Sequence, residues 1–495
     1  MDRGGPLMKP IWKLYGDGGA PPPGEVVAPG ERLSWGRTAG LGAQHVVAMF
    51  GATFVFPLMM GLDPNLAIMM SGLATILFLL IVRNRIPSYL GSSASFVGAA
   101  ALISPGGANP ALVTGAVCVA GIVLALSGWA IHLIGPKAVL AAFPPAVTGA
   151  VVMLIGFNLA PVVADSYWPF DQWIGLATMA FVILATVLLR GFAGRIAILL
   201  GLVFGFALSW LADLLAGPAA LPDGGTAPRV DLSAVGEAAW FGLPELHAPE
   251  FQVSAALVAL PAVIALIAEN AGHVKAVQEM TGDDLDPYMG RAIAADGIAT
   301  ALSSAVGGAP TTTYAENIGV MAATRVYSTA AYYAAALAAI LFGLCPKFGA
   351  LVAAVPEGVL GGITVVLYGM IGLLGAKIWV ENRVDFGNPV VLVPLAAGLI
   401  AGIGGVRLEF TEAFAVEGIA LGTFITLAGY HLLYRLAPES MRPRPAGPAE
   451  VPAQGAGTVL GTGSDAVRAE DAEPGRGAPD APGPESGGEA DPERP

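Results

Sequence analysis

The sequence predicts an all-α polytopic membrane protein, and three observations predict that fold class. First, 55% of the 495 residues are hydrophobic and 12% are charged, whereas roughly 25% of residues are charged in a soluble domain. Second, apolar runs of about 18 residues or more recur from Thr38 to Arg435, and each is long enough to cross a hydrocarbon core about 30 Å thick. Third, Lys and Arg are concentrated in alternate loops between those runs.

Polar residues, Pro and Gly divide the apolar region into about 14 predicted membrane segments. The third and tenth segments are the shortest. The segments begin near residues 38, 65, 87, 110, 138, 171, 194, 251, 287, 310, 327, 347, 388 and 413.

The basic residues of the loops predict the orientation. If the N-terminus is cytoplasmic, thirteen Lys and Arg residues lie on the cytoplasmic side and three on the opposite side. This bias follows the positive-inside rule, and it predicts an even number of spans with both termini in the cytoplasm. The cytoplasmic set is Arg83, Arg85, Lys137, Arg190, Arg195, Lys275, Arg291, Arg325, Lys377, Arg383, Arg435, Arg442 and Arg444, and the opposite set is Arg229, Lys347 and Arg407.

The two ends of the chain are predicted to lie outside the membrane region. Residues 1–36 are polar and rich in Gly and Pro, without an apolar core before a cleavage site, so we expect a cytoplasmic segment and no cleaved signal peptide. Residues 438–495 are rich in Pro, Gly, Ala and Glu and are predicted to form a disordered cytoplasmic tail. Its eleven acidic residues and five arginines supply −6 of the formal net charge of −13, so that charge indicates no basic partner.

The chain is predicted to consist of two related halves. The long polar loop of residues 213–250 separates seven predicted segments from seven, and residues 144–149 and 356–361 share the pattern PxxVxG. Because each half has an odd number of spans, a repeat must be inverted across the membrane, which is the architecture that secondary transporters use.

The third and tenth segments begin with residues that start helices poorly. They read PSYLGSSASF from residue 87 and GGAPTTTYAE from residue 307. Such stretches favour an extended backbone followed by a half-helix, which persists at membrane depth only where protein or a cavity satisfies the backbone. We expect the two extended pieces to pair and the following helix N-termini to point at one central site. The alternative is an ordinary kink at a helix-packing contact.

Three ionisable residues inside apolar segments predict a functional centre. Such groups are costly in a membrane, so Glu269, His273 and Glu316 indicate a substrate, ion or proton site. Glu269 and His273 are four residues apart, hence on one helical face, which suits proton handling. The alternative is a structural pair that ties helices together. Gln44 and His45 form a parallel pair in the first segment, and we expect them to support the site rather than bind a ligand directly.

The pattern Glu316-Asn317-x-Gly319-x4-Thr324-Arg325 resembles the signature of the nucleobase-ascorbate transporter family, also called nucleobase:cation symporter 2. The similarity covers roughly residues 25–437 and excludes the tails. Other motifs occur in the family's order, namely Gln44-His45, Tyr89-Leu90-Gly91-Ser92-Ser93, Glu269 with His273, and Thr312-Thr313-Tyr314.

The resemblance implies a transporter domain over residues 37–437. It implies a core domain of spans 1–4 and 8–11, about residues 38–134 and 251–345, and a gate domain of spans 5–7 and 12–14, about residues 138–216 and 347–436. It also implies a homodimer in the bacterial cytoplasmic membrane, with a proton as the coupling ion and no cofactor.

The same resemblance implies roles for individual residues. Glu269 and Glu316 would accept hydrogen bonds from ring N–H groups of a nucleobase, and His273 would contact a carbonyl group and aid proton coupling together with Glu269. The backbone amides of Ala94 and Ala315 would donate to substrate carbonyls. Tyr314 and Tyr368 would line the pocket, with Asn317 and Thr313 supporting it.

The substrate implied is uracil or a related pyrimidine. Uracil-type members of the family carry Glu at the first signature position, as Glu316 does here, whereas purine-type members usually carry Gln. The stretch of residues 280–291 is similar to pyrimidine permeases encoded with bacterial uracil-degradation enzymes. Ala94 and Ala315 replace the Phe and Gly of familiar uracil permeases, so the pocket volume leaves thymine and larger bases open, and a xanthine or urate permease is the alternative.

Two other classes of function are less consistent with the sequence. An intramembrane enzyme would need a motif such as HExxH or GxSxG, and neither occurs. A channel could also use broken helices, but its flux would not saturate or counter-exchange. Cys118 and Cys345 lie in apolar stretches without CxxC spacing, so we expect neither a disulfide nor a metal site.

Overall fold

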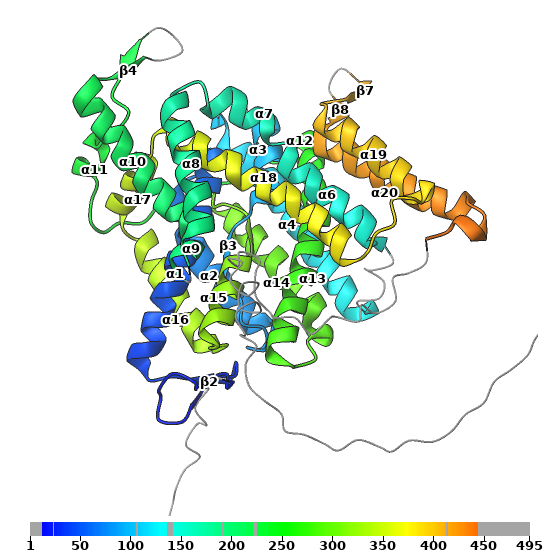
Figure 1. Cartoon of the computed structure of the whole chain (residues 1–495), viewed down its shortest axis with the longest axis horizontal. Coiled ribbons are helices and arrows are strands. Elements are labelled where there is room, and N and C mark those ends of the chain that lie inside the picture. The colour runs from blue at the N-terminus through cyan, green and yellow to red at the C-terminus, as the bar shows by residue number, and fades with distance from the viewer. Residues whose placement is uncertain are drawn as a thin grey trace, which may run out of the picture.

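The computed structural model describes residues 12–22, 24–104, 107–135, 142–190, 192–220, 225–411 and 414–443, and the predicted C-terminal tail lies almost wholly outside them. The described chain is mainly helical (Figure 1). The helices are α1 (Trp35–Met59), α2 (Pro64–Ile81), α3 (Val97–Ile103), α4 (Pro110–Ile134), α6 (Pro145–Phe157), α7 (Ala160–Val162), α8 (Gln172–Leu188), α9 (Phe192–Arg195), α10 (Ala197–Ala216), α11 (Ser233–Glu237), α12 (Val253–Ala259), α13 (Pro261–Thr281), α14 (Asp286–Ala305), α15 (Ala315–Thr324), α16 (Thr329–Gly343), α17 (Pro346–Ala353), α18 (Glu357–Glu381), α19 (Pro389–Ile403) and α20 (Gly418–Leu436).

The strands of the described chain are short and paired. They are β1 (Lys13–Leu14) with β2 (Glu31–Arg32), β3 (Leu90–Ser92) with β6 (Thr311–Thr313), β4 (Ala219–Ala220) with β5 (Thr226–Ala227), and β7 (Arg407–Thr411) with β8 (Phe414–Glu417).

Seven helices of the described chain are long and apolar enough to cross a membrane, or eight if α16 and α17, bent by 81°, form one broken span. Shorter apolar helices include α6, α8 and α19. A helix begins close to most of the predicted segment starts, whereas the starts near residues 138 and 413 lie outside the described residues. The full count of 14 spans stays a prediction. The seven are α1, α2, α4, α10, the stretch Val253–Thr281, α18 and α20.

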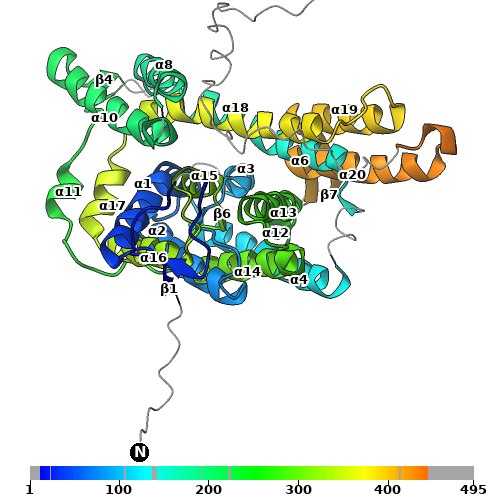
Figure 2. The ribbon, with the colours of Figure 1, turned by 60° about the horizontal axis from the view of Figure 1, so that its bottom comes forward.

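The helices form two groups that lie one above the other in Figure 2. In the lower group, α14 packs on α4, and α16 packs on α1 and α2. In the upper group, α18 packs on α6 and α8, and α19 packs on α20. The half-helices α3 and α15 belong to the lower group, so that group contains both broken segments.

Small residues allow α4 and α14 to approach until their backbones touch. A Cβ placed on Gly128 would lie 2.2 Å from the backbone nitrogen of Ala294, and one on Gly297 would lie 2.2 Å from that of Ala125. Close backbone approach through small residues is a common way of packing helices in a bilayer, where apolar side chains gain little by leaving lipid.

The two PxxVxG patterns begin two helices that pack against each other. Pro144 and Pro356 are the N-caps of α6 and α18, with nearly equal dihedral angles of φ −62°, ψ 152° and φ −62°, ψ 143°. Along the contact, Gly149 meets the backbone of Gly375, and Gly156 that of Gly372. The residues of α18 that are contacted decrease in number as the residues of α6 increase in number, so the two helices run antiparallel.

The predicted twelfth segment, starting near residue 347, is divided between two helices. The short helix α17 occupies Pro346–Ala353, and the long helix α18 begins only at Glu357. Pro356 fixes the break because proline disfavours helical conformation in the residue before it. The predicted start of the last segment near residue 413 lies outside the described residues, and the last helix, α20, begins at Gly418 after the hairpin β7–β8.

The N-terminal segment docks on the junction of α15 and α16 instead of standing free. Val27 is fully buried and its amide bonds the carbonyl of Arg325 at 2.9 Å. Arg325 ends α15 with a left-handed φ of 56°, and its guanidinium donates to the carbonyl of Pro22 at 3.0 Å. The arginine of the signature motif therefore has a structural contact with the segment before α1.

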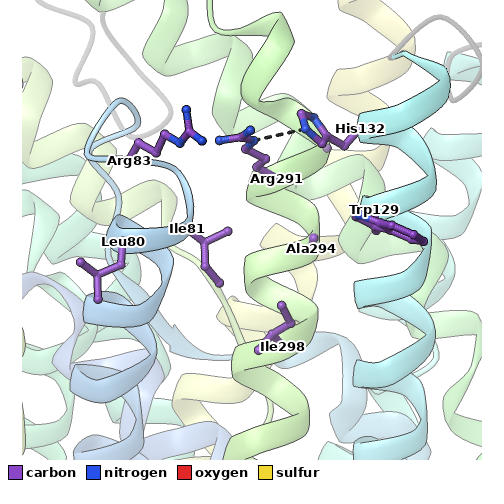
Figure 3. A pocket seen from close by; sticks show the side chains of 9 residues that line it. Leu80, Ile81, Arg83, Trp129, His132, Arg291, Ala294 and Ile298 are labelled. Carbon is purple, nitrogen blue, oxygen red and sulfur yellow. Dashed lines mark hydrogen bonds between the residues drawn. The ribbon is translucent and has the colours of Figure 1, made fainter.

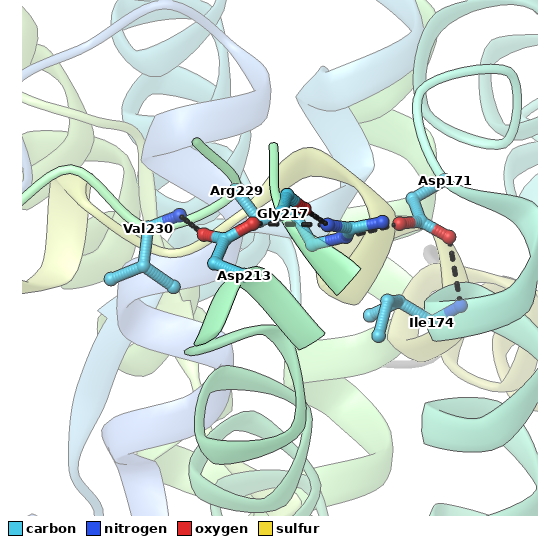
Figure 4. A network of polar contacts seen from close by, with 6 residues as sticks. All are labelled: Asp171, Ile174, Asp213, Gly217, Arg229 and Val230. Carbon is cyan, nitrogen blue, oxygen red and sulfur yellow. Dashed lines mark hydrogen bonds and ion pairs between the residues drawn. The ribbon is translucent and has the colours of Figure 1, made fainter. Parts of the chain in front are cut away.

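One arginine of the long central loop is paired with two aspartates (Figure 4). The Nε of Arg229 lies 2.6 Å from Asp171 at the start of α8, and its Nη1 lies 3.0 Å from Asp213 in α10. Asp171 also caps α8 by accepting from the amide of Ile174 at 3.1 Å. Arg229 is one of the three basic residues that the positive-inside bias assigns to the non-cytoplasmic side, and the two aspartates neutralise its charge.

Candidate functional site

The two broken segments cross as a short antiparallel pair of strands. Leu90 pairs with Thr313, Gly91 with Thr312 and Ser92 with Thr311. The ladder extends at both ends, because Ser93 donates to the carbonyl of Pro310 at 2.9 Å and Tyr314 to that of Tyr89 at 3.0 Å. The predicted pairing of the two extended pieces is therefore confirmed.

A threonine from a neighbouring helix satisfies the outer edge of each strand. Thr75 of α2 accepts from the amide of Leu90 at 2.9 Å and donates to its carbonyl at 3.4 Å. Thr300 of α14 accepts from the amide of Thr311 at 3.1 Å and donates to its carbonyl at 3.0 Å. Open strand edges are not tolerated in the apolar region of a membrane, so these hydroxyl groups permit irregular backbone here. The sequence reasoning missed both residues.

Tyr314 holds the two strands together from one side. Its hydroxyl donates to the carbonyl of Ser92 at 2.8 Å and accepts from Thr53 at 3.2 Å, and the side chain is 4% exposed. A Cβ on Gly91 would lie 2.3 Å from the ring of Tyr314. Only glycine fits at position 91. The hydroxyl of Tyr314 is used in hydrogen bonds to the protein and does not point into an open pocket.

A half-helix follows each strand and leaves free amide groups at its start. The first begins with a 3-10 turn at Ala94–Phe96 before α3, and the second is α15, which begins at Ala315. Ala94 and Ala315 are half-buried, and their backbone N–H groups bond no acceptor among the described residues. Such first-turn amides are available to a ligand and carry the positive end of the helix dipole.

The two predicted acids lie on helices that pack together beside these N-termini. Glu316 is in the first turn of α15, and Glu269 is in α13. Both are half-buried, and neither forms an ion pair with the described residues. Gly272 and Gly319, each three residues further along the same helix as one of the acids, have no atom within 4 Å of an added Cβ, so the helix surface is open at both glycines.

A chain of hydrogen bonds fixes the tautomer of His273. Asn270 donates through its amide nitrogen to Asp296 at 2.7 Å and to the carbonyl of Leu266 at 2.9 Å, so its oxygen is an acceptor. That oxygen lies 3.3 Å from the hydroxyl of Thr313, which must donate to it. The same hydroxyl lies 2.7 Å from Nδ1 of His273 and therefore accepts from it. The proton of neutral His273 is on Nδ1, and Nε2 keeps a free lone pair.

Asp296 of α14 is a third buried acid that the sequence reasoning missed. It is fully buried, accepts from Asn270, and lies 3.4 Å from the hydroxyl of Thr311. It therefore connects α13, α14 and β6. The signal was available, because Asp296 is an acid in an apolar segment like Glu269 and Glu316.

Asn317 and His45 join α15 to α1. The amide nitrogen of Asn317 donates to Nδ1 of His45 at 3.1 Å and to its carbonyl at 3.0 Å. His45 is 1% exposed, and its ring centre lies 4.4 Å from that of Tyr332. His45 thus packs against Asn317, the residue that follows Glu316, and the neighbouring Gln44 is half-buried.

Tyr368 comes from the other group of helices. It lies in α18, is 2% exposed, and donates to the sulfur of Met59 in α1 at 2.7 Å. It is therefore a contact between the two helix groups. In the part of the chain that the structure describes, no three His, Cys, Asp or Glu side chains are grouped so as to hold a metal ion.

Two solved structures share this fold. The transmembrane domain of a cyanobacterium bicarbonate transporter, BicA, superimposes with a TM-score of 0.50 over 80% of this chain and 96% of that chain, at 14% identity. The murine anion transporter Slc26a9 in its inward-facing state superimposes with a TM-score of 0.58 over 81% of this chain and 68% of that chain, at 11% identity. These similarities indicate a transporter fold of helical, polytopic type.

Sequence comparison identifies closer relatives. "Putative pyrimidine permease RutG" of Escherichia coli strain K12 is 46% identical over 81% of this chain and 90% of its own length. A uracil permease of the same strain is 35% identical over 81% of this chain and 92% of its own, and one of Bacillus caldolyticus is 34% identical over 80% and 91%. A family model described as "Permease family" matches residues 36–409. The chain is therefore a multi-pass membrane transporter that belongs to this permease family, the nucleobase-ascorbate transporters that its signature motif predicts.

Proposed function

We propose that this protein is a secondary active transporter that takes up uracil or a related pyrimidine base with a proton across the bacterial cytoplasmic membrane. The observation that carries the proposal is the arrangement of Glu269 and Glu316 beside two half-helix N-termini with free amides. Relatives named uracil and pyrimidine permeases support the substrate class.

The site's groups complement a flat pyrimidine. Uracil has two ring N–H donors and two carbonyl acceptors. Glu269 and Glu316 supply acceptors, and the amides of Ala94 and Ala315 supply donors. Each match counts, because a polar group left buried without a partner costs about 1–3 kcal/mol. In this arrangement Tyr314 acts by holding the strands that carry both amides, and Tyr368 closes the site from α18.

The tautomer of His273 suggests how a proton is coupled to the base. Since Nδ1 is committed to Thr313, Nε2 can donate to a substrate carbonyl only after it has gained a proton. A proton on Glu269 would also avoid two like charges in one small cavity. Release of the proton on the cytoplasmic side would then weaken binding and release the base.

The two groups of helices provide the parts that alternating access needs. We assign the group with α1–α4 and α12–α16 as the core domain, and the group with α6–α10 and α18–α20 as the gate domain. The matched roles of Thr75 and Thr300, and of Pro144 and Pro356, support an inverted repeat. We further propose cytoplasmic termini and a homodimer.

The test is accumulation of radiolabelled uracil by proteoliposomes with an imposed inward proton gradient, in competition with unlabelled thymine, xanthine and urate. We expect saturable uptake that collapses with an uncoupler and is blocked by pyrimidines. Uptake that ignores the uncoupler would refute proton coupling. Transport of xanthine or urate without uracil would favour the purine alternative, for which Ala94, smaller than the Phe of familiar uracil permeases, leaves space.

A further inference from the structure

A pocket lined by none of the predicted site residues lies at the ends of three packed helices. It has a volume of about 490 Å³ and lies between α2, α4 and α14. Its lining residues are Leu80, Ile81, Arg83, Trp129, His132, Gly290, Arg291, Ala294 and Ile298 (Figure 3). None of these residues was singled out for the transport site.

The mouth of this groove is basic. Figure 3 shows the guanidinium groups of Arg83 and Arg291 pointing toward each other across it. Arg291 donates to Nε2 of His132 at 3.3 Å, and neither arginine forms an ion pair with a carboxylate of the described residues. Two converging cations without a counter-charge repel each other, so the mouth is complementary to an anion.

The backbone holds Arg83 at this mouth. Arg83 and Asn84 both have a left-handed φ of 56°, which is uncommon for residues other than glycine. The side chain of Asn84 accepts from the hydroxyl of Tyr333 at 3.0 Å, and its amide bonds the carbonyl of Leu79 at 2.7 Å. The turn is therefore fixed by two partners that do not belong to the groove.

The depth of the groove is apolar and faces the membrane. Leu80 is 59% exposed and Trp129 is 60% exposed, in helices that are apolar enough to span a bilayer. Ile298 lies seven residues beyond Arg291 on α14, about 10 Å deeper at the 1.5 Å rise of a helix. Trp129 lies near the end of α4, the level where tryptophan is enriched at membrane interfaces.

We propose that this groove binds one anionic phospholipid, with its phosphate between Arg83 and Arg291 and an acyl chain along Trp129, Leu80 and Ile298. The paired positive charges at headgroup level and the apolar wall below them match the two parts of such a lipid. Both arginines belong to the set that the positive-inside bias assigns to the cytoplasmic side, where anionic lipid attracts basic residues. This site is independent of the base that the protein transports.

The experiment uses the fluorescence of Trp129 in the full-length protein in lipid nanodiscs. The nanodiscs contain unbrominated phosphatidylcholine, and either phosphatidylglycerol or phosphatidylcholine with brominated acyl chains is added at increasing mole fraction. The quenching of Trp129 is obtained by subtracting the fluorescence of the Trp129→Phe variant from that of the parent protein. We expect brominated phosphatidylglycerol to quench Trp129 at an about 25-fold lower mole fraction than brominated phosphatidylcholine, since each of the two arginines contributes an about fivefold factor near an anionic headgroup.

Variants separate a built site from general charge. The double variant Arg83→Gln with Arg291→Gln should abolish the preference for phosphatidylglycerol. The double variant Arg83→Lys with Arg291→Lys should keep most of that preference. Each double variant is measured with and without Trp129→Phe, so that the signal of Trp129 can be isolated. The matched control, Arg383→Gln with Arg435→Gln, removes two exposed charges from helix ends elsewhere and should keep it. Equal quenching by both lipids, or a preference that survives loss of Arg83 and Arg291, overturns the proposal. Absence of quenching by either lipid also overturns it and indicates that a second copy or another protein covers the groove.

Discussion

Nδ1 of His273 lies 2.7 Å from the hydroxyl of Thr313, so a residue of α13 is bonded to the strand that begins the second broken segment. This contact links the proposed proton-handling group to the backbone that carries Ala315 and Glu316. A change in the protonation of His273 therefore acts on the same element that holds the free amide of α15.

Thr313→Val should reduce proton-driven uracil uptake about tenfold, the factor that corresponds to one hydrogen bond of about 1.5 kcal/mol. The loss should be accompanied by a changed dependence of uptake on pH, because the substitution frees Nδ1 of His273 and with it the choice of tautomer. Initial uptake rates at a series of external pH values provide the measurement. Thr364→Val is the control, since that buried hydroxyl bonds only carbonyls of its own helix. An unaltered rate and pH profile for Thr313→Val would contradict the proposed role of the contact.

Glu269→Gln should abolish accumulation while the protein remains folded. The amide is nearly isosteric with the carboxyl group, but it cannot carry the coupled proton. Uptake and elution of the purified variant as a single species are measured together. Glu279→Gln, an exposed position on the same helix, should transport normally. Near-normal accumulation by the Glu269 variant would exclude that residue from coupling.

Glu316→Gln should shift the preference from pyrimidines towards purines. A carboxylate offers only acceptors to the two N–H donors of uracil, whereas an amide adds a donor that the acceptors of a larger base can use. Competition of unlabelled xanthine against labelled uracil measures the shift, and we expect the ratio of the two inhibition constants to change about tenfold or more. A uniform loss of affinity for both bases would mean that Glu316 does not select between them.

Gly91→Ala should destabilise the strand pair and abolish transport. The added Cβ would lie 2.3 Å from the ring of Tyr314, which two hydrogen bonds hold in place, and 2.7 Å from the hydroxyl of Thr53. Overpacking of this kind costs about 1–3 kcal/mol. Thermal unfolding in detergent is the measurement, with Gly40→Ala in α1 as the control because no atom lies within 4 Å of its added Cβ. Equal melting temperatures for the two variants would refute the close fit.

Arg229→Gln should lower thermal stability by about 2 kcal/mol, because it leaves Asp171 and Asp213 without their shared cation at sites that are 14% and 16% exposed. The control is Lys377→Gln, which breaks an exposed pair with Glu381 and should have little effect. Transport should persist below the lowered melting temperature. A variant as stable as the parent would mean that the three charges contribute nothing measurable to the fold.

Much of the site could be predicted from the sequence, because ionisable residues and poor helix formers are easy to recognise within apolar segments, where burying them costs free energy. Glu269 and Glu316 are acids in membrane segments, and the stretches around Gly91 and Thr312 start helices poorly. The same signal pointed to Asp296, which was overlooked. Thr75 and Thr300 gave no signal, because a threonine in an apolar helix most often bonds its own backbone, and only packing brings these two against strand edges.

The sequence by itself determined that this chain is a membrane protein, the order of its apolar segments, the place of its two breaks and the family motif that the comparisons confirm. Those properties depend on composition and local spacing, because the thickness and low polarity of a bilayer set the length and hydrophobicity that a spanning segment needs. Only the tertiary structure decided which polar group meets which, as when Thr313 joins His273 to Asn270 and Arg229 joins α8 to α10. A hydrogen bond requires atoms within about 3 Å, and such contacts between distant segments are set by helix packing, which no local pattern specifies.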